Sequence, residues 1–223
     1  MKFIRKNEEP ASFIAWKQQA SSEWKPNWDN FQKPEKLEVH RSILVEQGCI
    51  CCYCGQRIAK EESHIEHFQP RTSFPELTLS YGNFLASCPG YTEETEASTP
   101  IAKRSQVFCG QKKGAWYDQD LTVSPLQADC DTYFRYTGQG NILPTQDLAK
   151  AFAAETTIKK LNLNHLQLKR GRERAIDGIL QDIETFSDDE LSQLIEAYKR
   201  LDSDGNHVPF CGAVVYILEQ FRA

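Results

Sequence analysis

The sequence lacks any long apolar run, and this absence excludes an integral membrane protein. The run near the C-terminal end, Ala213 to Leu218, has six residues, whereas a membrane-spanning helix needs about twenty. The first residues, MKFIRKNEEP, pass from basic side chains into a charged turn without the apolar stretch of a secretory signal. We therefore expect a cytoplasmic protein that has no membrane partner.

An excess of positive charge is also absent. The 223 residues include 26 Lys and Arg against 31 Asp and Glu, which gives a net charge of −5. This balance argues against a protein that coats nucleic acid unspecifically, although net charge does not describe local patches. Internal repeats and low-complexity tracts are absent as well. The length is sufficient for one sizeable domain or two small ones, each with its own core.

Apolar spacing and turn residues divide the chain into four segments. Helical spacing predicts N-terminal helices in residues 1–48, and a Cys-, Gly- and Pro-rich stretch without long helical periods follows in 49–120. Such a loop-rich segment buries little apolar surface, so a bound metal is its ordinary means of stabilisation. Alternating residues predict short strands in 121–144, and helical spacing returns in 145–223. The sequence therefore predicts an α+β protein with a metal-stabilised module embedded in a mostly helical chain.

Eight cysteines are present, and four of them lie between Cys49 and Cys54. Without a secretory signal, such clustering indicates metal binding rather than a disulfide framework. Two Cys-x-x-Cys pairs overlap here, and only Cys54 is followed by the glycine that a chelating turn favours, which selects Cys51 and Cys54. Tetrahedral zinc needs four ligands, and Cys88 and Cys109, each before turn-forming residues, are the candidates for the second pair. The alternative is that these last two are ordinary buried thiols.

A short polar run, His64-Ile-Glu66-His67, follows the first cysteine pair. Each of its three polar side chains can bind a metal or transfer a proton. On a strand, alternation puts His64 and Glu66 on one face and His67 on the other. A bend or bulge at His67 would bring that side chain back beside them. Taken alone, the run is as typical of an exposed polar strand as of a functional site.

Several of these motifs follow one another in an order that is typical of one enzyme family. The match covers about 65 residues. The motifs are Cys51-Cys-Tyr-Cys54-Gly, Glu66-His67-Phe-Gln-Pro70, Asn83 within Tyr-Gly-Asn-Phe-Leu, Cys88, and Cys109-Gly-Gln-Lys-Lys113-Gly. This order resembles the zinc-stapled branch of the HNH, or ββα-metal, endonucleases. The resemblance implies a small β-hairpin and helix held together by a structural zinc ion.

The resemblance also implies roles for individual residues in phosphodiester hydrolysis. His67 corresponds to the general base, Asn83 to the residue that orients it, and Glu66 to a ligand of the catalytic metal. This chemistry suits the residue types, because imidazole titrates near neutrality and can deprotonate water. A carboxylate beside a histidine suits a hydrated Mg²⁺ or Mn²⁺, which would stabilise the developing phosphate charge.

The sequence departs from the family pattern at the last metal ligand. The family usually has His or Asn directly after the final knuckle cysteine, and this chain has Gly110. His64, two positions before Glu66, is our candidate for the missing ligand, and Asp118 is a weaker one.

A wider likeness extends over most of the chain. The segments Glu46-Gln-Gly48 and Ser124 to Cys130, among others, resemble the PtuB-like HNH nuclease subunits of Septu and retron-associated anti-phage systems. That resemblance implies an effector nuclease with an ABC/SMC-like ATPase (PtuA-like) as partner. In retron systems it also implies a reverse transcriptase with its DNA–RNA product.

Two basic clusters interrupt the acidic chain. The first comprises Lys103, Arg104, Lys112 and Lys113, and its last two members, beside the predicted site, are candidate contacts to substrate phosphates. A second cluster on the predicted helices is as typical of a solvated helix face as of a nucleic-acid contact. It comprises Lys159, Lys160, Lys169, Arg170, Arg172 and Arg174.

The last helical region turns acidic. Residues 176–204 contain nine acids against Lys199 and Arg200, which disfavours contact with a phosphate backbone. Ser187 and Glu190 match a capping box at the start of one of its helices. The apolar stripes of these helices must be buried internally or on a partner, so this region is a candidate docking site for a protein.

Two other functions are compatible with the same motifs. The first is a zinc knuckle that binds nucleic acid or a partner protein without cleaving anything, and Gly110 at the usual ligand position favours it. The second is a thiol oxidoreductase that uses cysteines between Cys49 and Cys54. No βαβ pattern surrounds these cysteines, which argues against redox chemistry.

Overall fold

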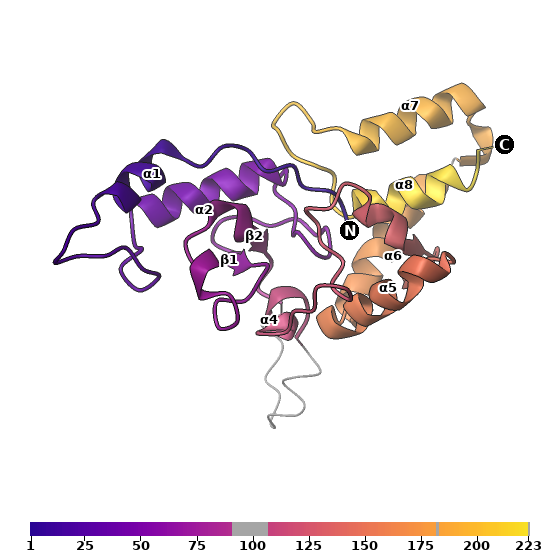
Figure 1. Cartoon of the computed structure of the whole chain (residues 1–223). Helices are drawn as coiled ribbons and strands as arrows, with labels where there is room; N and C mark the ends of the chain where they lie inside the picture. The colour runs from indigo at the N-terminus through magenta and orange to yellow at the C-terminus, as the bar shows by residue number, and fades with distance from the viewer. Residues whose placement is uncertain (91–106, 182, 223) are drawn as a thin grey trace, which may run out of the picture.

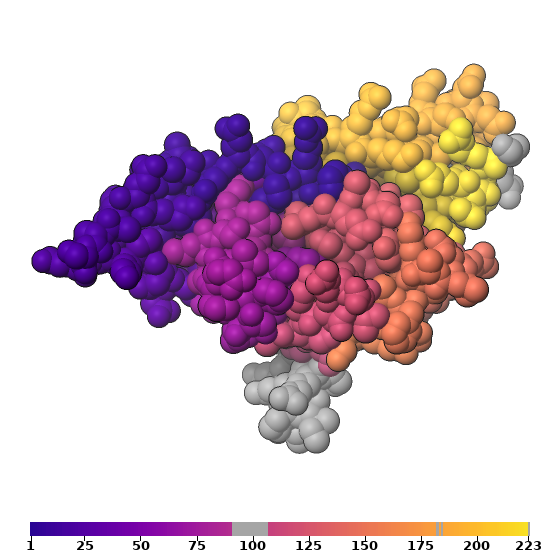
Figure 2. Space-filling model, in the orientation of Figure 1, coloured from indigo at the N-terminus to yellow at the C-terminus, as the bar shows by residue number. Residues whose placement is uncertain are grey.

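The computed structural model describes residues 1–90, 107–181 and 183–222. The N-terminal helices form one end of the molecule, a small hairpin and a short helix lie in the middle, and the C-terminal helices form the other end (Figure 1). A space-filling view shows the same succession along the surface (Figure 2). The α+β class predicted from the sequence is confirmed. Lys103 and Arg104 of the first basic cluster lie outside the described residues.

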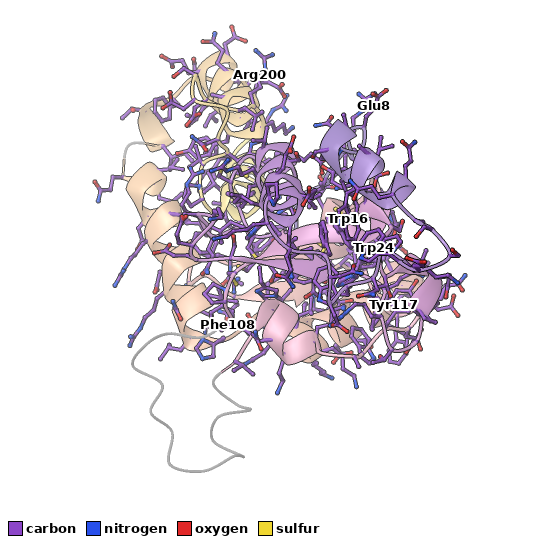
Figure 3. All side chains as sticks on the ribbon, turned by 90° about the vertical axis from the view of Figure 1, so that its left-hand side faces the viewer. Glu8, Trp16, Trp24, Phe108, Tyr117 and Arg200 are labelled. Atoms are coloured by element: carbon purple, nitrogen blue, oxygen red, sulfur yellow. The ribbon has the colours of Figure 1, made fainter. Side chains whose placement is uncertain are left out.

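Two helices and a layer of aromatic rings form the N-terminal end. Helix α1 spans Ala11–Gln18 and begins after Pro10, and helix α2 spans Glu35–Glu46. The ring of Phe13 contacts those of Trp16, Phe31 and Phe84, with centroid distances of 5.7, 4.6 and 6.0 Å. Trp16 and Trp24 lie edge to face in the same layer (Figure 3). The rings join these helices to the central hairpin, because Phe84 belongs to one of its strands.

The central module has the order strand, strand, helix. Strand β1 (His64–His67) pairs antiparallel with β2 (Phe84–Ser87), in a register that sets Glu66 opposite Leu85. The short helix α4 (Cys109–Lys113) follows. A second antiparallel hairpin, β3 (Phe134–Tyr136) with β4 (Ile142–Pro144), lies further along the chain. It confirms the short strands that the sequence predicts near this turn.

Four helices and their caps form the C-terminal end. They are α5 (Leu148–Leu161), α6 (Leu166–Leu180), α7 (Asp188–Lys199) and α8 (Cys211–Glu219). The capping box predicted at the start of α7 is present, because Ser187 and Glu190 bond each other's backbone N–H groups. Four single-turn 3-10 helices complete the described elements; they are η1 (Pro75–Leu77), η2 (Tyr81–Asn83), η3 (Cys130–Tyr133) and η4 (Ile183–Thr185).

Two hydrophobic cores hold these elements together. The first runs from Met1 to Leu168 and includes side chains from the N-terminal helices, the central module and α5. The second lies among α6, α7 and α8, from Ile176 to Leu218, so the apolar stripes of the acidic region are largely buried internally. Within the described residues, none of the helices combines the length and the apolar composition that a bilayer span requires.

A buried glutamine ties the end of α2 to the central hairpin. The side chain of Gln47 donates to the carbonyls of Ile50 and Ala86, at 2.8 and 2.9 Å, and accepts from the Ala86 N–H at 2.7 Å. The residue is only 2% exposed, so water cannot replace these bonds. One side chain therefore fixes the cysteine-rich turn against β2.

We expect Gln47→Leu to lower the free energy of unfolding by about 2–4 kcal/mol, because it leaves the Ala86 N–H and the Ile50 carbonyl buried without partners. Denaturant unfolding of the purified variant measures this loss. Gln18→Leu, at an exposed position of α1, is the matched control and should change stability little. Equal midpoints for the two variants would contradict the role given to Gln47.

Candidate functional site

The four cysteines selected from the sequence come together in the structure. Cys51 and Cys54 lie in a turn closed by the Gly55 N–H, which donates to the Cys51 carbonyl at 3.0 Å. Gly55 has φ +77, a conformation that glycine adopts readily. The Cys88 N–H donates to the sulfur of Cys51 at 3.4 Å, and Cys109 is the first residue of α4. The expected second pair is therefore not a set of scattered thiols.

The geometry of this four-cysteine cluster fits a tetrahedral zinc ion. All four sulfurs are buried and lie within 4.8 Å of one another. Zn–S bonds of about 2.3 Å imply sulfur–sulfur distances of about 3.8 Å, so a small contraction would complete the site. Burial alone would raise the pKa of Cys51, but hydrogen bonds from the surrounding thiols lower that pKa well below its ordinary value. The cluster thus already favours one thiolate.

The other cysteines lie outside this cluster. Cys52 is buried beside it, and burial raises the pKa of its thiol well above the ordinary value. Cys130 and Cys211 are buried elsewhere, and Cys49 is partly exposed. All eight cysteines are free thiols in the structure. The arrangement favours the metal interpretation over a redox pair.

Glu66 lies against the cluster, with its two carboxylate oxygens in different surroundings. Oε1 accepts from the Tyr53 hydroxyl at 3.1 Å and is 2.9 Å from the ammonium of Lys113. Oε2 lies 3.5 Å from Nε2 of His64. Burial would raise the pKa of Glu66, but the hydrogen bond from His64 and the charge of Lys113 outweigh it, so the pKa is lowered. Glu66 is therefore an ionised, buried carboxylate with one oxygen directed toward His64.

Gly110 leaves the space that His64 and Glu66 occupy. A Cβ atom built on Gly110 would lie 2.6 Å from Glu66 Oε2 and 3.0 Å from His64 Nε2, closer than these atoms tolerate without a shift. The two side chains thus converge on the point of α4 from which the side chain of a metal ligand at position 110 would project. The absence of a side chain at position 110 leaves room for the side chains of His64 and Glu66.

His67 lies on the opposite face of β1, as strand alternation predicts. The pairing of His67 with Phe84 continues the regular register, so the bulge that would return it to the face of Glu66 is not present. Its ring meets those of Trp28 and Phe84 edge to face, at centroid distances of 4.5 and 5.0 Å. Nε2 lies 3.0 Å from the carbonyl of Thr78. Burial lowers the pKa of His67, although the bond to Thr78 opposes the shift.

Asn83 contacts the loop between the strands rather than the imidazole of His67. Its side chain accepts from the Gln69 N–H at 2.8 Å and donates to the Gln69 carbonyl at 2.9 Å. A further bond reaches the carbonyl of Leu77 at 3.4 Å, next to Thr78 in the chain. Asn83 thereby fixes both ends of the loop that carries the carbonyl partner of His67.

The lysines of α4 differ from each other in exposure. Lys112 is partly exposed, whereas Lys113 is 3% exposed and donates to the carbonyl of His67 at 3.0 Å in addition to pairing with Glu66. Lys113 therefore has a buried partner instead of the solvent-facing phosphate contact that we expected. Asp118, the weaker ligand candidate, accepts from the N–H groups of Asp120 and Leu121 and caps its own turn.

One member of the second basic cluster is not on the surface. Arg172 is 2% exposed and donates to the carbonyls of Gly140 and Leu163, at 2.7 and 2.8 Å. Its assignment to a basic surface patch is therefore wrong. The neighbouring Arg170 and Arg174 on α6 are exposed.

Sequence reasoning missed two residues of the site, Tyr53 and Trp28. Tyr53 is 1% exposed and donates to Glu66; its position inside the Cys-x-x-Cys turn was a usable signal. Trp28 packs against His67, and the side chains of Lys36 and Arg71 lie over its ring at 4.5 and 4.9 Å. Only the fold brings Trp28 here, because it comes from the connector before α2.

We expect Cys54→Ala to abolish zinc binding and cooperative unfolding. The metal contributes about 10–16 kcal/mol in small structural zinc sites, which is more than the net stability of most domains. Metal analysis of the purified protein and a thermal melt measure both effects. Cys130→Ala, which removes an equally buried sulfur outside the cluster, should retain one zinc ion per chain. A Cys54→Ala protein with full zinc content and a normal melt would contradict the assignment.

Comparison with known proteins relates part of the chain to a protein of a retron. No protein-family model matches it. It is 30% identical over 151 residues to a protein of Vibrio cholerae serotype O1 biovar El Tor named "Retron Vc95 putative HNH endonuclease". The alignment covers 65% of this chain and 66% of that protein, slightly less than two thirds of its length. This likeness, together with the buried four-cysteine cluster and the order β1, β2, α4, supports an HNH-type module in the chain.

Proposed function

We propose that the chain is a metal-dependent HNH endonuclease that hydrolyses phosphodiester bonds of nucleic acid. The observation that carries the proposal is the convergence of His64 and Glu66 on the bare backbone of Gly110. Glu66 directly precedes His67, the last residue of β1, and their side chains leave opposite faces of the strand.

The residues that would hold the catalytic metal are Glu66, through Oε2, and His64, through Nε2. One carboxylate and one imidazole, with water and a substrate phosphate in the other positions, suit a hydrated Mg²⁺ or Mn²⁺. Oε1 of Glu66 is already engaged by Tyr53 and Lys113, which leaves Oε2 for this purpose. When bound, the cation supplies stabilisation for the charge on the phosphate and on the leaving oxygen.

His67 is the general base of this proposal. The carbonyl of Thr78 can only accept a hydrogen bond, so Nε2 of His67 must carry the hydrogen and Nδ1 is the nitrogen that can take a proton. The lowered pKa of His67 also favours a role as base, because the neutral imidazole, which can accept a proton, prevails at pH 7. Asn83 acts as a positioning residue by holding the loop that carries Thr78.

The biological setting is part of the same proposal. We assign the chain the role of effector subunit in an anti-phage defence complex with an ABC/SMC-like, PtuA-like ATPase. A retron reverse transcriptase and its DNA–RNA product are further partners. The name of the Vibrio cholerae relative supports the retron setting, and the PtuB-like resemblance of the sequence supports the ATPase.

A zinc-stapled binding module without catalysis is the second candidate. The ion pair between Lys113 and Glu66 favours it, because the ammonium already balances the carboxylate that would bind the metal. The position of His67 on the other face of β1 favours it too. The two candidates predict different outcomes of the same cleavage assay.

We expect His67→Ala to reduce cleavage of plasmid, single-stranded and transfer-RNA substrates by about 10²–10⁴-fold, the usual contribution of a general base. The zinc content and the circular dichroism spectrum should stay unchanged. His207→Asn, a change at a histidine outside β1 and β2 whose ring contacts the carbonyl of Arg200, is the control and should cleave normally. Undiminished cleavage by His67→Ala would remove this mechanism, and no cleavage by the parent chain in its full complex would favour the binding module.

We expect His64→Ala to weaken binding of Mn²⁺ to the zinc-loaded protein by about tenfold or more, because it removes one of two protein ligands. Electron paramagnetic resonance of free Mn²⁺ measures the affinity independently of cleavage. The side chain of His64 is 34% exposed, so its truncation should not disturb the fold. His207→Asn again provides the control, and equal Mn²⁺ affinity in the two variants would contradict the ligand assignment.

A further inference from the structure

Two recesses open on either side of β1. The larger, about 1230 Å³, lies between the cysteine-rich turn, the start of β1 and helix α6, and its charged walls include Arg57, Arg170 and Arg174. The smaller, about 410 Å³, lies between α2 and the loop before β1, and is lined by Lys33, Lys36 and Lys60. Both recesses are lined by Ser63 and His64. They therefore meet at the proposed metal ligand.

We propose that these two recesses form one continuous track for a single strand of nucleic acid, which crosses the proposed site at His64. The inference rests on the proposed nuclease function for the position of the scissile phosphate. The inference adds that the substrate is a single strand, and it names the elements that hold this strand on each side of His64. The N-terminal half of the molecule holds it on one side, and helix α6 of the C-terminal half holds it on the other.

The charge of the track supports a polyanionic ligand. The smaller recess has three lysines and two histidines on its walls and no acid. In the larger one, Glu61 and Glu62 oppose the three arginines, so its net charge is only slightly positive. Summed over both recesses, six Lys and Arg side chains face two carboxylates, which is the reverse of the balance in the chain as a whole.

Arg170 and Arg174 are the clearest candidates for phosphate contacts in the larger recess. They lie four residues apart on α6, where like charges repel by a few tenths of a kcal/mol. Neither guanidinium has a carboxylate within 4.0 Å among the described residues. By contrast, Lys159 and Lys199 on the neighbouring helices α5 and α7 are each paired with glutamates. Phosphate oxygens would provide the missing counter-charges.

The shape and the apolar walls favour a single strand over a duplex. Phe210 and Leu166 line the larger recess, and such an apolar surface suits the faces of unpaired bases. A duplex keeps its bases stacked inside and presents phosphates on a convex surface. It would rest on the rim of the recesses and leave these apolar walls without contacts.

Binding of labelled oligonucleotides to the zinc-loaded chain tests the track. The His67→Ala background removes cleavage, and the probes are fluorescein-labelled 30-nucleotide DNA and RNA strands and the matching DNA duplex. We expect the two double changes Arg170→Gln with Arg174→Gln, and Lys33→Gln with Lys36→Gln, each to weaken single-strand binding at least tenfold. Each should also reduce the slope of log affinity against log salt by about 1.4, the value for two phosphate contacts on a single strand.

The matched control is Lys199→Gln with Arg200→Gln, which removes the same charge at the far end of the molecule from Phe108 and α4 (Figure 3). It should change affinity less than twofold. Equal effects of the control and of either track variant would overturn the proposal, and so would a duplex that binds as tightly as the single strands. The relative affinities for the DNA and RNA strands identify which of them the track prefers.

Cleavage by the same variants with an intact His67 separates the two proposals. Lost single-strand binding together with lost cleavage supports both. A chain that binds single strands through the track but never cleaves them supports the track and removes the nuclease. Track variants that cleave single strands as fast as the parent chain would remove the track and leave the nuclease.

Discussion

The convergence of four sulfur atoms on one point is the constraint on which the rest of the site depends. Strands β1 and β2 have four residues each, and α4 has five, which is too short for independent stability in water. The cluster joins the cysteine-rich turn to the residue after β2 and to the first residue of α4. Because Gly110 directly follows Cys109, the same constraint sets the backbone of α4 beside Glu66. The carboxylate is therefore positioned by sulfur geometry rather than by the stability of the local elements.

Glu66 shows how one buried charge is shared between structure and the proposed chemistry. Lys113 and Tyr53 stabilise Oε1, which makes burial of the carboxylate tolerable, because an unpaired buried charge costs several kcal/mol. Oε2 faces His64 across the space above Gly110. A side chain at position 110 would press on Oε2 of Glu66 and on Nε2 of His64, so both would have to shift to make room for it. The departure from the family pattern thus has a steric explanation within this chain.

Local patterns predicted the parts of the site that depend on short-range geometry. The glycine after Cys54 identified the correct cysteine pair, and strand alternation put His64 and Glu66 on one face of β1. The pairing of Lys113 with Glu66 was not predictable, because it joins residues whose contact depends on the closed cluster. The burial of Arg172 was not predictable for a similar reason. Its partner Gly140 lies 32 residues away, and the burial depends on how a hairpin packs on α6. Spacing along the chain cannot reveal a partner that only the fold supplies.

The distribution of charge reconciles an acidic chain with a polyanionic substrate. Unspecific attraction to nucleic acid depends on the number of phosphates that the protein can neutralise, and a net charge of −5 keeps that number small over most of the surface. Nine of the 31 acidic residues lie in residues 176–204, whose helices pack on one another through their own core. Six Lys and Arg side chains, against two carboxylates, line the recesses that meet at His64. A nucleic-acid strand that enters these recesses would gain attraction there, whereas one that lies elsewhere would meet repulsion, so the fold directs binding toward His64 at the start of β1.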